Sequence, residues 1–186
     1  EDPFNRLVYG RPPASTADWA WIQHMYASLT PKGRIAVVMD NGVLFRGSSE
    51  AKVRQAFLEL DVVDAVIGLP GNLFANTSSP ACILIIDKNK PTNRKGKVLF
   101  VDASNDYIEG QAQNHLRDED ITKTLGTYTD YSTIERYCSV CDLEEIKEND
   151  YNLNISRYVD TTEPEVPVII EEEMDQLKVL EAQREE

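Results

Sequence analysis

Apolar and polar positions along the first half of the chain predict helices and strands in alternation. After an irregular start, Thr16 or Asp18 can cap a helix that runs to about Leu29. A second helix is expected over residues 50–60, after a serine cap at position 48 or 49. The apolar faces contain Trp21, Ile22, Met25 and Leu29 in the first helix, and Val53, Phe57 and Leu60 in the second. Both faces are expected to pack on strands of the same protein.

Four continuous apolar runs predict buried strands. They are RIAVVMD (34–40), DAVIGL (64–69), ACILIID (81–87) and KVLFVDA (97–103). Alternation of helix and strand favours an α/β fold with a parallel sheet covered on both faces. The second and third runs are separated by residues 70–80 alone, which is too short for the crossover that joins parallel strands. We therefore expect an antiparallel hairpin at one end of an otherwise parallel sheet.

The chain becomes polar after Ser104. We accordingly divide it into a first domain over residues 1–103 and a polar, mainly helical extension over 104–186. Short helices are expected at 118–125, 131–137 and 143–148, and a last one from Glu171 onward. This last helix has a narrow apolar stripe, so we expect it to pack on a partner.

Charge is distributed unevenly. The net charge of −13 argues against a nucleic-acid-binding protein as a whole. Residues 163–186 hold nine acids and two bases, whereas residues 88–97 hold five bases and no acid. The basic stretch is therefore either a local nucleic-acid surface or a solvated turn between strands, and the turn is the simpler interpretation.

The three cysteines give little sign of a metal site. Cys82 lies in an apolar run and is interpreted as a small buried residue. Cys138 and Cys141 form a lone C-x-x-C, which is either half of a zinc site or a redox pair, but the two histidines are not suitably spaced to complete a site. We therefore predict no metal. Sparse cysteines favour a reducing, cytoplasmic location. No apolar run approaches the roughly 20 residues of a membrane span, and the first residue, Glu1, suggests a piece of a longer protein.

Two loops stand out as candidate binding elements. The sequence has no G-x-G turn, no phosphate-binding loop and no G-x-S-x-G element, so no nucleotide or hydrolase site is predicted. Ligands of open α/β sheets bind beyond the carboxyl ends of parallel strands. Two such loops, DNGVLF and PGNLFANT, place Asn41, Phe45, Asn72 and Phe74 there. Phe45 is expected to fold back as a loop anchor, whereas Phe74 is either an anchor or an exposed binding surface.

Several segments in order resemble a known family. They are ADWAWIQHM, LTPKGRIAVVMDNGVLFRGSSEAKVRQAFLE, VDAVIGLPGNLFANTSSPACILIIDKNK, GKVLFVDAS and NDYNLNISRYV. Together, from about Tyr9 to Val159, they resemble the modification (M) subunit of type I restriction-modification systems, which are DNA adenine-N6 methyltransferases. The nearest alternative is the related group of enzymes that fuse cleavage, methylation and recognition in one chain.

The resemblance implies a truncated Rossmann-like class I methyltransferase sheet that contains strands five, six and seven, the last one reversed. The glycine-rich turn that binds S-adenosylmethionine and the Asn-Pro-Pro-aromatic motif of the family are absent, so we predict no catalytic and no cofactor-binding residue here. At the position of Phe74 the family has an aromatic that stacks on the flipped adenine. Asn72 and Thr77 are then expected to bond the base edge or the DNA backbone, with Asn41 in the same crevice.

The resemblance also implies partners. They are a specificity subunit, a restriction subunit and double-stranded DNA, in the bacterial cytoplasm. Residues 151–186 match the part expected to dock on the specificity subunit, and the open strand edge at 35–40 allows self-association. The isolated chain is predicted to bind no S-adenosylmethionine and to be inactive. The alternative function is a noncatalytic docking module.

Overall fold

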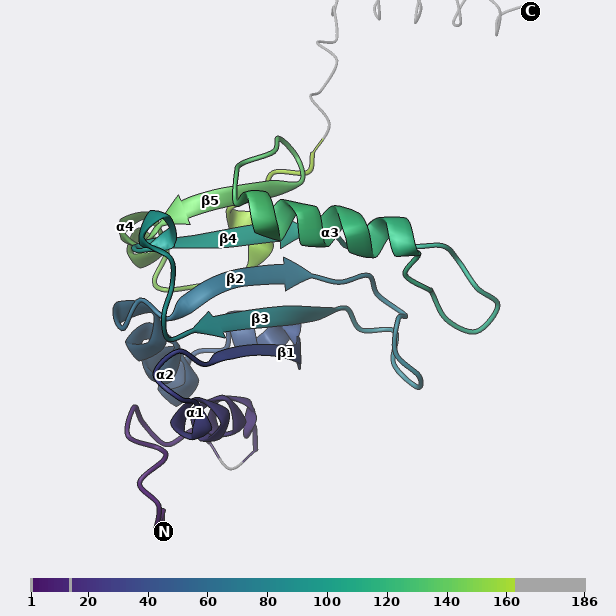
Figure 1. Ribbon diagram of the computed structural model, residues 1–186. Coiled ribbons are helices and arrows are strands. Elements are labelled where there is room, and N and C mark those ends of the chain that lie inside the picture. The colour runs from purple at the N-terminus through teal and green to yellow at the C-terminus, as the bar shows by residue number, and fades with distance from the viewer. Residues whose placement is uncertain (1, 14, 163–186) are drawn as a thin grey trace, which may run out of the picture.

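A computed structural model describes residues 2–13 and 15–162, in which five strands form one mixed sheet (Figure 1). The strands are β1 (Arg34–Asp40), β2 (Val63–Gly68), β3 (Ala81–Asp87), β4 (Lys97–Asp102) and β5 (Cys138–Asp142). Their order in space is β1-β3-β2-β4-β5. β2 and β4 pair in parallel, while β3 is antiparallel to both β1 and β2, and β5 is antiparallel to β4. Thus β1, β2 and β4 all run in one direction.

The predicted hairpin is formed by β2 and β3, and its antiparallel pairing is confirmed. Its expected place at one end of the sheet is wrong, because β3 lies between β1 and β2. The sequence of β3 explains this position: almost every residue in it is buried, and a strand without water at its edges needs partners on both sides for its backbone. β1, by contrast, has exposed residues at every second position and lies at the edge.

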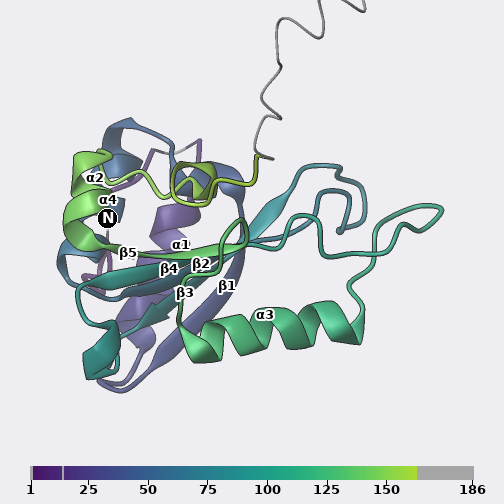
Figure 2. The ribbon, with the colours of Figure 1, turned by 90° about the horizontal axis from the view of Figure 1, so that it is seen from above.

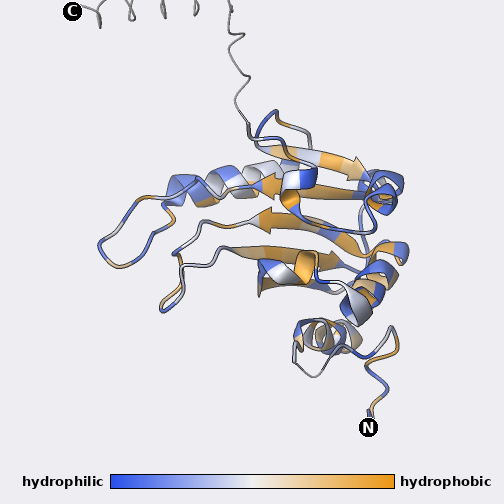
Figure 3. Cartoon of the chain, turned by 180° about the vertical axis from the view of Figure 1, so that it is seen from behind, coloured by the Kyte–Doolittle hydropathy of each residue, from blue (hydrophilic) through white to orange (hydrophobic). Residues whose placement is uncertain are grey.

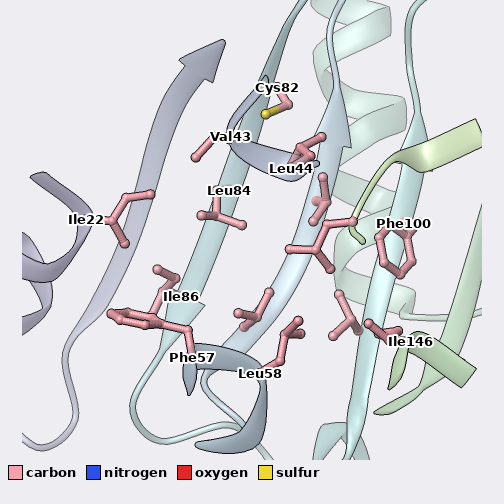
Figure 4. Packing of buried hydrophobic residues seen from close by; sticks show 14 of the residues in the cluster. Ile22, Val43, Leu44, Phe57, Leu58, Cys82, Leu84, Ile86, Phe100 and Ile146 are labelled. Atoms are coloured by element: carbon pink, nitrogen blue, oxygen red, sulfur yellow. The ribbon is translucent and has the colours of Figure 1, made fainter. Parts of the chain in front are cut away.

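Helices cover both faces of the sheet, as predicted (Figure 2). α1 (Asp18–Ser28), α2 (Ser48–Glu59), α4 (Leu143–Glu148) and a 3₁₀ turn at Ile155–Arg157 pack on one face, and α3 (Asp118–Asp130) lies on the other. The larger core is on the α2 side, where Phe57, Leu84 and Phe100 are fully buried (Figure 4). The strands are mostly hydrophobic along their length, whereas the loops that project beyond the sheet are largely polar (Figure 3).

The predicted apolar faces of the first two helices are confirmed in part, because Ile22, Val53 and Phe57 are fully buried. Trp21 and Leu60 are 63% and 43% exposed, while Trp19 and Gln23 are buried. Hydrogen bonds to the rest of the protein explain the difference: the Trp19 indole donates to the Val43 carbonyl, and the Gln23 amide bonds two backbone groups of the N-terminal segment. The expected caps are also wrong, because neither helix has a side-chain bond at its N-cap.

The second half of the chain departs most from expectation. α4 is where it was predicted, and α3 extends to Asp130, where Tyr131 adopts a left-handed conformation with φ 49° and ends it. Residues 131–137 are not a helix, and β5 was not predicted at all. β5 joins the sheet of the first half through β4. The division at residue 103 stays a prediction.

Cys138 and Cys141 point into different cores. The two residues lie three positions apart on β5, so their side chains face opposite sides of the sheet. Cys138 packs under α3, whereas Cys141 belongs to the larger core. The redox-pair interpretation is therefore wrong. Within the part of the chain that the structure describes, no group of three or more potential ligands is placed to hold a metal.

Candidate functional site

The carboxyl ends of β1, β2 and β4 meet at one edge of the sheet, as their common direction requires. The loop after β1, residues 41–47, and the loop after β2, residues 69–80, leave this edge on either side of the start of β3. Asp40 pairs with Ala81 on one side, and Gly68 pairs with Cys82 on the other. The two candidate loops therefore share an edge, on the right of Figure 1.

The loop over residues 69–80, called here the Phe74 loop, has a fixed backbone. Asn72 and Asn76 both adopt left-handed conformations, at φ 53° and 65°, which asparagine tolerates better than other side chains. The Asn72 backbone amide donates to the Ser78 carbonyl over 3.2 Å, and this bond closes the loop. Thr77 adds a second turn, since its amide donates to the Phe74 carbonyl.

Phe74 remains outside this closed loop. Its side chain is 39% exposed, although burying a phenylalanine stabilises a fold by about 1.5–3 kcal/mol. No residue from 69 to 80 is charged, so the loop that carries the ring is neutral. The Thr77 hydroxyl accepts a hydrogen bond from the Ser79 amide over 3.1 Å. The bonds of Asn72 given by the structure run through its backbone.

The loop after β1 presents its residues differently. Asn41 begins a 3₁₀ turn, η1 (Asn41–Leu44), and its side-chain oxygen is buried without a hydrogen-bond partner in the described residues. Asn41 thus shares the edge with the Phe74 loop but does not present this oxygen to solvent. Phe45 is 48% exposed, so the expectation that it folds back as an anchor is wrong. Arg46 holds this loop by donating to Asp18 and Asp40 over 2.5 and 2.6 Å.

The basic stretch at 88–97 lies at the opposite edge, since it follows the antiparallel strand β3. Lys90 is buried and donates to Asp61, over 2.7 Å, and to two backbone carbonyls. Arg94 donates to Asp64 over 3.2 Å and stacks against the rings of Tyr128 and Tyr131. These two charges are used inside the fold, so neither a solvated turn nor a nucleic-acid surface describes the stretch fully.

The cluster around Asp64 was not predicted from the sequence. Asp64 is fully buried and accepts from the Tyr128 hydroxyl as well as from Arg94. Burial, together with this bond to the Asp64 carboxylate, raises the pKa of Tyr128 to about 12. The cluster fastens the C-terminal end of α3 to the sheet. Its only sequence signal is an acid at the start of an apolar run, which is too common to interpret.

Two hollows in the described residues lie away from Phe74, Asn72 and Thr77. One is an apolar groove of about 240 Å³ between α3 and the sheet, with Ile83, Ile121 and Leu125 among its lining residues. The other, of about 360 Å³, is an open depression beside Trp21 and His24. The candidate site is thus an exposed edge with a projecting ring, and neither hollow encloses it.

Comparison with known proteins identifies the family. A family model described as N-6 DNA methylase matches residues 1–166. The chain belongs to the N-6 DNA methylase family. It is 43% identical, over 93% of its length, to the methylase subunit of the type I restriction enzyme MjaVIII from Methanocaldococcus jannaschii.

Solved methylase structures extend this likeness to the fold. The chain is similar to the type I restriction-modification methyltransferase subunit from Streptococcus thermophilus, with a TM-score of 0.79 and 45% identity over 86% of this chain. The EcoKI M protein shares the fold at 18% identity and a TM-score of 0.65, over 90% of this chain and 43% of that one. The α/β Rossmann-like class predicted from the sequence is thereby confirmed. The chain spans about a third of these relatives, 30% of the MjaVIII subunit and 34% of the Streptococcus protein.

Family membership implies S-adenosylmethionine, and the glycines at this edge show whether the chain fits it. A cofactor that approaches a strand end needs open space beside a glycine. At Gly42, Gly68 and Gly71 that space is filled by Arg46, by Ile155 and by the Ser78 carbonyl, respectively, whereas Gly47 is open. The three glycines nearest to the strand ends therefore do not form a cradle for the cofactor. None of the described helices is both long and apolar enough to span a membrane.

Proposed function

We propose that this chain is the part of a DNA adenine-N6 methyltransferase subunit that presents an aromatic surface to a flipped adenine. Membership of the N-6 DNA methylase family and 43% identity to a type I methylase subunit support this proposal. The reaction would transfer a methyl group from S-adenosylmethionine to the amino group of the base. Because the chain spans about a third of its relatives, this activity belongs to the whole subunit.

The observation that carries the proposal is the exposure of Phe74 on a fixed, uncharged loop at the carboxyl edge. A base inside a duplex cannot reach a methyl donor, so methyltransferases rotate it out of the stack and hold it by stacking and edge contacts. An aromatic ring contributes about 1–3 kcal/mol to such a contact. A ring that the protein leaves in water, on a backbone that it holds, suits this purpose.

The polar residues beside the ring have separate roles in this proposal. Asn72 offers a side-chain donor and acceptor to the base edge, and Thr77 retains its hydroxyl proton as a donor while its oxygen serves the turn. Asn41 has its side-chain oxygen shielded, so its contact with DNA requires the loop after β1 to move.

The methyl donor is held elsewhere in the subunit. S-adenosylmethionine supplies the methyl group, and the described residues here bind and orient the base. We expect the isolated chain to bind no cofactor and to methylate no DNA. Calorimetric titration with S-adenosylmethionine tests this, and micromolar binding to the 186-residue chain would contradict it.

The test of the base-binding role is Phe74→Ala in a complete subunit that carries this sequence. Affinity for DNA with 2-aminopurine at the target adenine should fall about five- to 150-fold, the equivalent of about 1–3 kcal/mol, while Phe74→Trp should retain it. Phe45→Ala is the matched control, since Phe45 has similar exposure on the neighbouring loop. Unchanged binding and turnover in Phe74→Ala would refute the role.

The partners proposed for the complete subunit are a specificity subunit, a restriction subunit and double-stranded DNA, in the cytoplasm. Leu153, Ile155 and Val159 are buried in the larger core, so these side chains are not available to a partner. Docking on the specificity subunit is therefore left to the exposed residues of 151–162 and to residues 163–186, which lie outside the described residues. Deletion of residues 163–186 should weaken co-purification with the specificity subunit and leave the circular dichroism of the sheet unchanged.

The open edge of β1 supports self-association of the isolated chain. Val38 on this strand is 50% exposed, and an edge strand offers unpaired backbone groups to a second strand. Sedimentation velocity should detect a dimer that Val38→Lys removes, because a lysine on an edge strand opposes pairing. A single monomer boundary at high concentration would contradict this part of the proposal.

A further inference from the structure

A segment from the second half of the chain bonds directly to the backbone of the Phe74 loop. The Asn114 side-chain amide donates to the Gly71 carbonyl over 2.8 Å, and the Asn114 backbone amide donates to the Asn72 carbonyl over 2.7 Å. The Gln113 side-chain amide donates to the Leu73 carbonyl over 3.3 Å. Three donors from two adjacent residues thus bind three consecutive carbonyls, which end one residue before Phe74.

The donors belong to a loop, residues 105–117, that is itself fastened at both ends. Near its start, Asp106 accepts from Lys123 and from the Tyr137 hydroxyl, each over 2.8 Å. At its end, Arg117 pairs with Asp120 of α3 through two bonds of 2.8 and 2.9 Å. Between these anchors, Ile108 and His115 exchange a pair of backbone bonds of 2.9 and 3.0 Å.

This arrangement makes the 105–117 loop a brace of defined shape. It projects beyond the sheet beside the Phe74 loop (Figures 1 and 2), and the direct bonds fix the contact between the two loops. The Phe74 loop has few other supports, because its residues from 71 to 80 are at least partly exposed. The bonds of Asn72 and Thr77 close the loop from within, and the 105–117 loop supplies the bonds that hold it from outside.

We propose that Asn114 is a positioning residue, which sets the direction of the Phe74 ring by holding the carbonyls of Gly71 and Asn72. The inference rests on the proposed base-stacking function of Phe74. Stacking requires the ring within about 0.5 Å and 10–20° of its working position. The peptide groups of residues 71–73 fix the position of the Phe74 backbone. Hydrogen bonds to their carbonyls therefore also restrict the direction in which the ring points.

Losing the brace should lower the affinity for the flipped base, because fewer molecules then hold the Phe74 loop in the conformation that binds. Apparent affinity falls in proportion to the fraction of molecules in that conformation. Asn114→Ala keeps the backbone donor and removes the side-chain donor, so affinity for the flipped base should fall about three- to tenfold. Asn114→Asp has nearly the same shape, but it places a carboxylate oxygen against the Gly71 carbonyl and should be at least as damaging.

The first measurement is hydrogen exchange of residues 70–79 in the 186-residue chain. Both Asn114 variants should speed exchange in this segment, while Gln111→Ala, at an exposed position of the same loop, should not. The urea midpoint should stay close to the wild type for all three variants. Unchanged exchange in Asn114→Ala and Asn114→Asp would overturn the inference, whatever the DNA assays give.

The second measurement uses the complete subunit and the 2-aminopurine duplex. The Asn114 variants should lower affinity and kcat/KM without the change in global stability that a purely structural residue would cause. Faster exchange with unchanged affinity, in a protein whose Phe74→Ala variant binds weakly, would also overturn the inference. If Phe74→Ala binds normally, the proposed function fails, and the exchange result alone decides whether Asn114 fixes the loop.

Discussion

The two loops at the carboxyl edge are held in opposite ways. The loop after β1 is supported mainly from its own half of the chain: Arg46 reaches Asp18 and Asp40, and the buried Arg54 donates to the Arg46 carbonyl over 2.9 Å. One bond comes from the second half, where the Leu153 backbone amide donates to the Leu44 carbonyl over 2.9 Å. The Phe74 loop takes its support from residues 113 and 114, some forty positions later in the sequence.

The difference indicates which loop can be loosened without exposing the core. Val43 and Leu44 of the loop after β1 are part of the larger core, so that loop cannot open without exposing apolar surface. The Phe74 loop contributes only its first residues to buried surface. Binding elements are usually drawn from such low-stability segments, and the sequence placed the candidate ring in this one.

The largest expected effect concerns Arg54, which supports the loop after β1 from inside the fold. Arg54 is buried and bonds the carbonyls of Arg46 and Tyr151, with the buried Glu50 carboxylate nearby. Arg54→Met should lower the free energy of unfolding by about 3 kcal/mol, because it removes the donor to these carbonyls and one of the two cations near the buried Glu50 carboxylate, the other being Arg46. Urea denaturation measures the loss. The exposed Arg157→Met is the control, and equal losses in both variants would contradict the assignment.

A prediction of intermediate size uses the reactivity of Cys82 to distinguish the two loops. The Cys82 thiol lies beneath Val43 and Leu44 (Figure 4), and burial, with a smaller contribution from Asp40, raises its pKa to about 12. Thiol labelling at neutral pH should therefore be very slow and should quicken as pH rises toward that value. Arg46→Ala removes the ion pairs that hold the covering loop, worth about 1 kcal/mol, and should speed labelling about fivefold.

The same assay gives a control for the comparison. Asn114→Ala loosens only the Phe74 loop, which does not cover this thiol, so the labelling rate of Cys82 should not change. Equal acceleration by the Arg46 and Asn114 variants would mean that the two loops open together.

The smallest effect concerns the anchor of the brace. The hydrogen bonds from Arg117 lower the pKa of Asp120 below its ordinary value of 3.8, and Lys123 acts in the same direction. A carboxylate whose pKa is lowered in the folded state stabilises the fold above pH 3.8, the ordinary pKa. This stabilisation is lost as the pH falls through the pKa of the folded state. The protection factors of residues 105–117, which are the intrinsic exchange rates at each pH divided by the observed rates, should therefore fall as pH is lowered from about 6 to about 3. Asp120→Asn should remove this dependence, and an unchanged profile would contradict it.

Local patterns predicted most of the central sheet. Continuous apolar runs identified β1 to β4, and loop length alone required β2 and β3 to be antiparallel. β5 was missed because its two cysteines and a serine give no strand pattern, and its pairing depends on an edge supplied by β4. On α1, Trp19 and Gln23 were missed as buried residues because hydrogen bonds to distant backbone groups decide which side chains turn inward.

The candidate site divides in the same way. An aromatic residue in an uncharged loop after a buried strand was enough to single out Phe74. The support of that loop could not be predicted, because Asn114 lies in a polar stretch whose partner carbonyls are distant in sequence. Sequence patterns thus indicated the group that faces a ligand, and only the fold revealed what holds it.

The opposite orientation of Cys138 and Cys141 gives this protein a pair of internal reporters. One thiol lies under α3 and the other in the core that α4 helps to cover. A reagent that reacts with only one of them reports which helical layer has separated from the sheet. Unfolding of the two sides can therefore be followed independently in a single sample, by mass spectrometry and without any added label site.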